Sequence, residues 1–286
     1  CGVGNTNTAA QGFTHTLAIR VSGTADPLLA LTGAVTLIGL NVDGSNGDGI
    51  VITGNGSTVR DCYVGTAIDG TAGTGNSDSG IVIDAADNVT IGPYVVASGN
   101  GDSGILADGD VDFLTVKAVI AGLQRDASAV LANGDDGLTV DVGTSNATEL
   151  IVGGATAADG NVFSGNSANG LYIEGDVDGD SGFDCLVGNN IVGTDGAVTL
   201  DRGNTFNGIA FEPASNSSFP NQIEVIDNVV SGNSQSGIRV AGASLMGFAG
   251  NAIGTDPTGT LSLPNTGDGL YFVATNAANT ADHLVG

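Results

Sequence analysis

The sequence predicts an all-β protein, a single right-handed parallel β-helix over residues 1–286 with three sheets and about 8–9 coils. Three observations predict this fold: a recurring glycine marker, the composition, and three strand-like runs in each coil. Marker glycines precede aliphatic runs at intervals of 31, 24, 33, 33, 38, 29 and 32 residues, and they are Gly49, Gly80, Gly104, Gly137, Gly170, Gly208, Gly237 and Gly269. With 48 Gly, nine Phe and no Trp, the chain suits narrow solenoid layers better than a wide globular core.

The shortest coil, residues 80–103, shows how each coil is divided. Its strand-like runs are Ile81 to Ile83, Val89 to Ile91 and Tyr94 to Val96, with Asp, Asn, Gly and Pro between them. Three strands per coil predict three faces. Coils stacked at roughly 4.8 Å would form three parallel sheets with inward ladders of Val, Ile and Leu.

Longer coils carry polar insertions, which we expect to be surface loops at Thr66 to Ser79, Thr194 to Asn207 and Thr255 to Asp268. The repeated glycines and asparagines around them are expected to be scaffold. Glycine permits the left-handed backbone of a sharp corner, and asparagine tolerates it while its amide bonds the coil above or below. Catalysis is not needed to explain either residue type.

The two ends follow the same repeat. Residues 17–42 read as one further coil, so we expect no separate N-terminal domain, and "ADHLVG" at 281–286 matches "FDCLVG" at 183–188. Neither end shows a capping helix. We therefore expect the β-helix either to be part of something longer or to be completed by another molecule.

The alternation of "IGTDPTGT…NTGDGLYF" coils with "NVFSGNSANGLYI" coils resembles the right-handed β-helix repeat regions of large secreted and cell-surface bacterial proteins. More distantly, it resembles the pectate-lyase-like superfamily. The resemblance covers about Leu17 to the end of the chain. It implies the fold and an extracellular or cell-surface location. It leaves function open, because enzymes, adhesins and structural stalks share such repeats.

Charge and hydropathy exclude two classes of partner. The formal net charge of −25 would repel phosphate backbones, so we expect no nucleic-acid binding. Because no apolar run is long enough to cross a bilayer, we also expect no membrane insertion.

Asp135, Asp136 and Asp195 are the carboxylates to weigh for polysaccharide cleavage. The Gly-His-Gly and Arg-x-Lys elements of polygalacturonase-like sites are missing from the sequence, and its six Lys and Arg residues are too scattered for a lyase base cluster. We therefore predict no catalytic residues and no enzyme activity. A polysaccharide-degrading enzyme that uses the inserted loops stays open as an alternative.

A calcium site is indicated by carboxylates at alternate positions, namely Asp176, Asp178, Asp180 and Asp184. The match to a calcium loop is partial, because Ser181 holds the sixth position and no Glu closes the loop. The competing interpretation is a solvated acidic turn. Ca²⁺ is the one cofactor that the sequence suggests.

The cysteines are predicted to serve different purposes. Cys62 and Cys185 are four coils apart, roughly 19 Å, which is too far for a disulfide, and are expected to be buried ladder residues. For Cys1, three alternatives stay open: lipid attachment after signal cleavage, pairing with another subunit, or the start of a fragment.

Taken as a whole, the sequence favours a non-catalytic extracellular structural protein, either a surface stalk or a subunit that stacks head to tail into a filament. Its expected partner is a second copy of itself, bound end to end. The alternative from another class is a carbohydrate-binding adhesin whose partner is an extracellular glycan.

Overall fold

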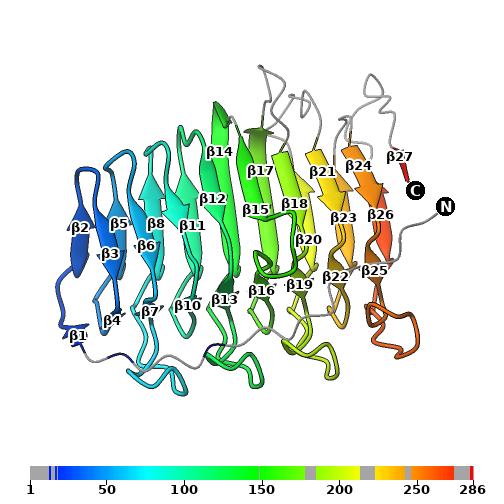
Figure 1. Ribbon diagram of the computed structural model, residues 1–286, viewed down its shortest axis with the longest axis horizontal. Coiled ribbons are helices and arrows are strands. Elements are labelled where there is room, and N and C mark those ends of the chain that lie inside the picture. Colours follow the sequence, from blue (N-terminus) through cyan, green and yellow to red (C-terminus); the bar gives the residue numbers. More distant parts are fainter. Residues whose placement is uncertain are drawn as a thin grey trace.

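The computed structural model shows one right-handed parallel β-helix whose coils stack along a single axis (Figure 1). It describes residues 13, 17, 19–147, 149–177, 185–212, 223–241, 246–273 and 284–285. Each of the three sheets contains nine parallel strands, in agreement with the expected number of coils. All elements in these ranges are strands, and they include no helix that could span a membrane.

The strands fall into three sheets, which each coil visits in the order A, B, C. Sheet A contains β1 (Ile19–Ser22), β4 (Leu40–Asp43), β7 (Tyr63–Val64), β10 (Val95–Ala97), β13 (Val119–Ala121), β16 (Val162–Phe163), β19 (Ile191–Val192), β22 (Val229–Val230) and β25 (Ala252–Ile253). Sheet B contains β2 (Leu29–Leu31), β5 (Ile50–Ile52), β8 (Ile81–Asp84), β11 (Ile105–Asp108), β14 (Leu138–Ala147), β17 (Leu171–Val177), β20 (Ile209–Glu212), β23 (Ile238–Ala241) and β26 (Leu270–Val273). Sheet C contains β3 (Thr36–Ile38), β6 (Thr58–Arg60), β9 (Thr90–Ile91), β12 (Leu114–Val116), β15 (Leu150–Gly153), β18 (Cys185–Gly188), β21 (Ile223–Ile226), β24 (Met246–Ala249) and β27 (Leu284–Val285).

The marker glycines set the register of sheet B. The residues that follow them pair in one continuous row, from Ile50 with Ile81 through to Ile238 with Leu270. Space explains the glycine: a Cβ on Gly137 would lie 2.6 Å from the Gly170 carbonyl oxygen and 2.9 Å from Asn166 Nδ2. The coils approach too closely there for any side chain.

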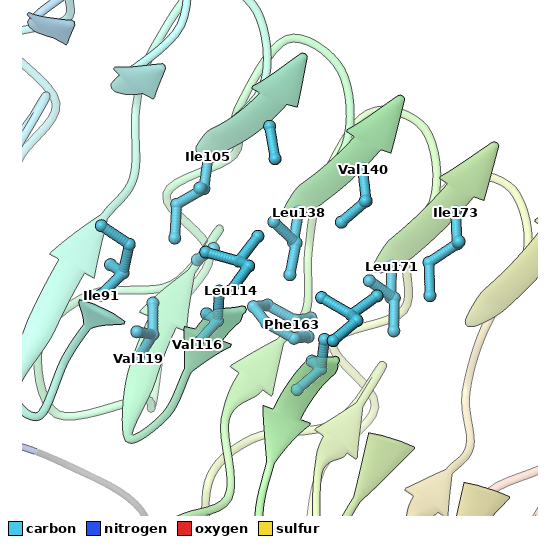
Figure 2. Close-up of a cluster of buried hydrophobic side chains, with 14 of the residues drawn as sticks. Ile91, Ile105, Leu114, Val116, Val119, Leu138, Val140, Phe163, Leu171 and Ile173 are labelled. Atoms are coloured by element: carbon cyan, nitrogen blue, oxygen red, sulfur yellow. The ribbon is translucent and has the colours of Figure 1, made fainter. Parts of the chain in front are cut away.

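The core is a narrow column between the three sheets (Figure 2). Sheet B contributes Ile105 and Leu138, sheet C contributes Leu114, and sheet A contributes Phe163, each no more than 2% exposed. Because side chains alternate between faces of a strand, every second residue enters this column. The inward aliphatic ladders expected from the sequence are confirmed.

Asparagines, all buried except the half-buried Asn265, form a ladder at the corner between sheets A and B. Each Nδ2 donates to the Oδ1 of the next member at 2.9–3.1 Å. The members are Asn76, Asn100, Asn133, Asn166, Asn204, Asn233 and Asn265. A second ladder joins Asn161, Asn190, Asn228 and Asn251 at the corner between sheets C and A. The prediction that asparagine amides bond neighbouring coils is confirmed, but none of these ladder asparagines has the left-handed backbone that was also expected.

The first and last coils and the cysteines follow the repeat. Leu284 and Val285 lie in the same sheet C rows as Leu186 and Val187, so the match between "ADHLVG" and "FDCLVG" is confirmed at these two positions, and residues 281–283 and 286 lie outside the described residues. Cys62 and Cys185 are both buried and lie in coils four apart, as predicted. Their contexts are not equivalent, however. Cys62 directly precedes the sheet A strand β7, whereas Cys185 begins the sheet C strand β18.

Candidate functional site on the outer face of sheet A

The predicted calcium residues can be followed only in part. The backbone of Asp176 lies in β17 and pairs with Asn146 of β14. Asp178, Asp180 and Asp184 lie outside the described residues, as does Cys1. Within the described ranges, no group of three Asp, Glu, His or Cys side chains is arranged to hold a metal ion.

Asp136 is a buried carboxyl held by its neighbours in the scaffold. Its Oδ1 accepts hydrogen bonds from the backbone N–H and Nδ2 of Asn169 at 2.5 and 3.0 Å, and its Oδ2 accepts one from the Thr139 hydroxyl at 3.0 Å. Burial outweighs these bonds and raises the pKa of Asp136 to about 6. Asp136 lies two residues before β14, just as Asn169 lies two residues before β17 and Asn207 two residues before β20. The Asn169 amide donates to Asp136, and the Asn207 amide donates to Asn169, so Asp136 stands where the following coils have asparagine.

Replacing Asp136 with Asn is expected to stabilise the protein above pH 6. The folded-state pKa lies above that of the unfolded chain, so the carboxyl's favourable contribution is present at pH 4 and is lost as pH rises through about 6. Asp136→Asn should therefore raise the free energy of unfolding at pH 7.5 by about 2–3 kcal/mol, with little effect at pH 4. Urea titrations at both pH values measure this difference.

The control for this prediction is Asp110→Asn, which removes a negative charge from an exposed turn. It should change the free energy of unfolding by at most about 0.5 kcal/mol at either pH. An equal gain from Asp136→Asn at pH 4 and pH 7.5 would contradict the proposed cost of ionising Asp136.

Asp195 lies apart from Asp135 and Asp136. Asp135 and Asp136 precede β14, whereas Asp195 follows β19 two coils later, roughly 10 Å along the axis. The Asp195 Oδ1 accepts the backbone N–H groups of Thr199 and Leu200 at 2.6 and 2.7 Å. These bonds explain Asp195 as a turn-closing residue.

Four hairpins project from one edge of the β-helix, one after every second strand of sheet A (Figure 1). They are closed by the antiparallel pairs Thr66 with Gly73, Leu123 with Val130, Thr194 with Asp201, and Thr255 with Ser262. The sequence predicted only three of them and extended each too far, because Asn76, Asn204 and Asn265 already belong to the ladder. Hairpin 123–130 was missed.

The first three hairpins contact one another. The backbone N–H of Arg125 donates to the Gly70 carbonyl at 3.0 Å, and that of Gly196 donates to the Ala127 carbonyl at 2.9 Å. Side chains add to these contacts, since Arg202 Nε donates to the Ser128 carbonyl at 2.9 Å. Hairpins 66–73, 123–130 and 194–201 therefore form a continuous row.

The outer face of sheet A beside these hairpins is apolar and covered. Its outward side chains, called here the outer row, are each fully buried, and they are Tyr63, Val96, Ile120, Val162, Ile191 and Val229. Leu123, Ala127 and Val198 from the hairpins, and Leu263 directly after the fourth hairpin, pack in the same cluster. A strand buried on both faces reads as consecutive apolar residues, as in "VVA" at 95–97 and "VIA" at 119–121. That signal was available in the sequence.

Phe13, from the start of the chain, also belongs to this cluster. It is 5% exposed, its backbone N–H donates to the Arg125 carbonyl at 2.6 Å, and its ring meets the edge of Tyr94 with centroids 5.4 Å apart. Leu17, 8% exposed, packs in the same cluster. Phe13 thus contacts Tyr94 and Arg125, which follow it in the sequence by 81 and 112 positions.

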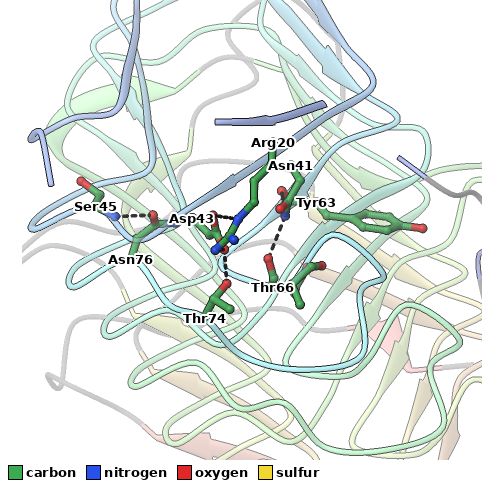
Figure 3. Close-up of polar contacts among 9 residues, drawn as sticks. Arg20, Asn41, Asp43, Ser45, Tyr63, Thr66, Thr74 and Asn76 are labelled. Atoms are coloured by element: carbon green, nitrogen blue, oxygen red, sulfur yellow. Dashed lines mark hydrogen bonds and ion pairs between the residues drawn. The ribbon is translucent and has the colours of Figure 1, made fainter. Parts of the chain in front are cut away.

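In the first two strands of sheet A, polar side chains take the place of the apolar outer row (Figure 3). Arg20 binds both carboxylate oxygens of Asp43, at 2.8 and 2.6 Å, and the Thr74 hydroxyl donates to the same carboxylate. Burial alone would raise the pKa of Asp43, but these bonds outweigh it and lower that pKa. Next to it, buried Asn41 donates through Nδ2 to the Tyr63 and Thr66 carbonyls and so fixes the base of hairpin 66–73.

Around Phe13, the described part of this face presents the apolar outer row, the ring of Tyr94 and the backbone carbonyl of Arg125. Comparison with protein-family models, curated proteins and solved structures found no match to this chain.

Proposed function

We propose that this chain is a non-catalytic structural β-solenoid that serves outside the cell as a surface stalk or as a filament subunit. The ladder from Asn76 to Asn265 is the observation that carries the proposal. It adds six side-chain hydrogen bonds along the axis to the backbone bonds of three sheets. The polar residues of the repeat are thereby used to hold coils together. The resemblance of the repeats to those of secreted bacterial proteins supports the extracellular location.

Apolar side chains of the last described coil form the surface that end-to-end stacking would bury. Phe272 belongs to the inward row of sheet B, paired with Val240, yet it is 39% exposed in the last described coil. Ile253 of sheet A is half-buried there. A further coil supplied by a second copy would cover both side chains and extend the three sheets. Such a head-to-tail contact does not close, and so it produces a filament.

Electron microscopy of the purified protein tests this proposal. Nine strands per sheet at about 4.8 Å give an expected subunit step of roughly 40 Å along a filament. Imaging with and without a calcium chelator tests whether Asp176, Asp178, Asp180 and Asp184 bind Ca²⁺ that supports assembly. Isolated short rods in both conditions would contradict end-to-end stacking.

The non-catalytic part needs its own test, because rods and filaments are compatible with enzyme activity. Release of reducing ends from neutral and acidic polysaccharides should stay at the buffer level. Release that is abolished by Asp136→Asn or Asp195→Asn would overturn the proposal and assign the chain to the carbohydrate-active enzymes.

A further inference from the structure

The outer face of sheet C carries four threonines in register on the neighbouring strands β3, β6, β9 and β12. Val59, Ile91 and Val116, which follow three of them in the strands, are fully buried, so the threonine side chains point away from the core. Successive members lie about 4.8 Å apart along the axis. The members, called here the threonine row, are Thr36, Thr58, Thr90 and Thr115.

The hydroxyl groups of the threonine row are not used by the scaffold. Ser57 and Thr139 show the other arrangement, since their buried hydroxyls bond neighbouring coils. In the part of the chain that the structure describes, no hydroxyl of the row bonds another protein group, and all four residues are half-buried or exposed. Because a β-branched side chain has few χ1 rotamers, each hydroxyl is held in place before a ligand arrives.

The face around the row is close to neutral, although the protein is strongly acidic. Strands β3, β6, β9, β12, β15 and β18 contain no Asp or Glu. The basic residues beside the row, Arg60 and Lys117, are paired with Asp61 and Asp159 at 2.6 and 3.9 Å. By contrast, sheet B carries five carboxylates in one row, namely Asp84, Asp108, Asp141, Glu174 and Glu212. An uncharged partner therefore fits sheet C, because the net charge of −25 repels polyanions.

The spacing of the row selects among uncharged chains. An extended peptide presents the side chains of one face every second residue, roughly 6.6 Å apart, and so falls out of step with the row. In a linear polysaccharide, one sugar unit follows the next at close to the strand spacing, and every unit brings hydroxyl groups that donate and accept hydrogen bonds. Phe113, 43% exposed and two residues before Thr115, adds an apolar ring on which a sugar can stack.

We propose that the threonine row and Phe113 bind a neutral linear polysaccharide that lies along the axis of the β-helix and is not cleaved. Each threonine hydroxyl bonds one sugar unit, and the Phe113 ring covers the apolar face of a unit at the end of the row. This binding goes beyond the structural role proposed above. It does not require end-to-end stacking, so short rods that bind glycan would leave it intact.

The test uses cellohexaose, a neutral β-1,4-linked glucan of six units, and calorimetric titration of the full-length protein. We expect saturable binding. A triple variant, Thr58→Val with Thr90→Val and Thr115→Val, keeps the β-branched shape and removes three hydroxyls, so it should bind about tenfold or more weakly. Phe113→Ala should weaken binding about threefold or more. No binding by the folded parent would overturn the proposal.

The matched control replaces three exposed threonines outside sheet C, as Thr24→Val with Thr32→Val and Thr53→Val. It should bind cellohexaose as the parent does. Equal weakening by the two triple variants, or no weakening by either, would overturn the location of the site. A hexamer of galacturonic acid should bind the parent more weakly than cellohexaose, and equal or tighter binding would overturn the assignment of an uncharged ligand.

A measurement on the parent alone covers the case in which the triple variant does not fold. Titration with cellohexaose, followed by amide chemical shifts in NMR, should move the signals of Thr58, Thr90 and Thr115 and leave that of Thr53 unchanged. Shifts confined to residues outside sheet C would overturn the proposal.

Discussion

Replacing Asn166 with alanine is expected to lower the free energy of unfolding by roughly 3–5 kcal/mol. Asn166 is 1% exposed; its Oδ1 accepts from Asn133, and its Nδ2 donates to the Ala121 carbonyl and to Asn204. Alanine would remove three buried hydrogen bonds and leave one Nδ2 hydrogen of Asn133 without its partner, although Asn133 still donates to the Ala97 carbonyl and the Ala121 carbonyl still accepts from the Ser164 N–H. A buried donor left unpaired costs about 1–3 kcal/mol, and each further hydrogen bond lost costs about 0.5–1.5 kcal/mol. Equilibrium denaturation in urea measures the loss.

Asn55→Ala is the matched control, because Asn55 is exposed and its amide bonds Asp87 instead of the ladder. It should change stability by no more than about 0.5–1 kcal/mol. Equal losses for Asn166→Ala and Asn55→Ala would show that the buried ladder contributes no more than an exposed amide pair.

Gly137→Ala is expected to be at least as damaging, with a loss of roughly 3 kcal/mol or more. The new Cβ would lie 2.6 Å from the Gly170 carbonyl oxygen, which is backbone and cannot rotate away. Relieving the contact would force two coils apart and stretch sheet B around β14 and β17. Thermal and urea unfolding should both report the loss.

Gly247→Ala provides the control for backbone entropy. A Cβ on Gly247, in β24 of sheet C, meets nothing within 4 Å, and its φ lies outside the left-handed region. Alanine there should be neutral or should stabilise by about 0.4–1 kcal/mol through the unfolded state. If both variants lose the same stability, close packing of coils is not the reason for the marker glycine.

The repeat could be predicted because each coil poses the same steric problem. Glycine recurs before Ile50, Ile81 and Ile105 because the backbones of neighbouring coils approach too closely there for a side chain. The period of this glycine predicted the strands of sheet B. Hairpin 123–130 was missed because Leu123 stands where the others have Thr. Yet its eleven-residue spacing from Gly122 to Asn133 equals that from Gly65 to Asn76.

Other features depend on contacts that no local pattern contains. The corners between sheets C and A need a left-handed residue, and Asn189 meets that expectation with φ 59°. Ala118 and Tyr94 adopt the same region, with φ 47° and 63°, because coil geometry overrides their preference. The packing of Phe13 against Tyr94 joins residues 81 positions apart and could not be read from either segment.

Hydrogen exchange of the native protein tests most directly whether the polar residues of the repeat are scaffold. The backbone N–H groups of Asn100, Asn166 and Asn204 donate to ladder side chains at 3.0–3.2 Å. We expect them to exchange as slowly as strand amides such as Ile105, through opening of the whole β-helix. Exchange as fast as at the exposed hairpin amides of Thr71 and Ser128 would contradict the claim that the asparagine ladder holds the coils together.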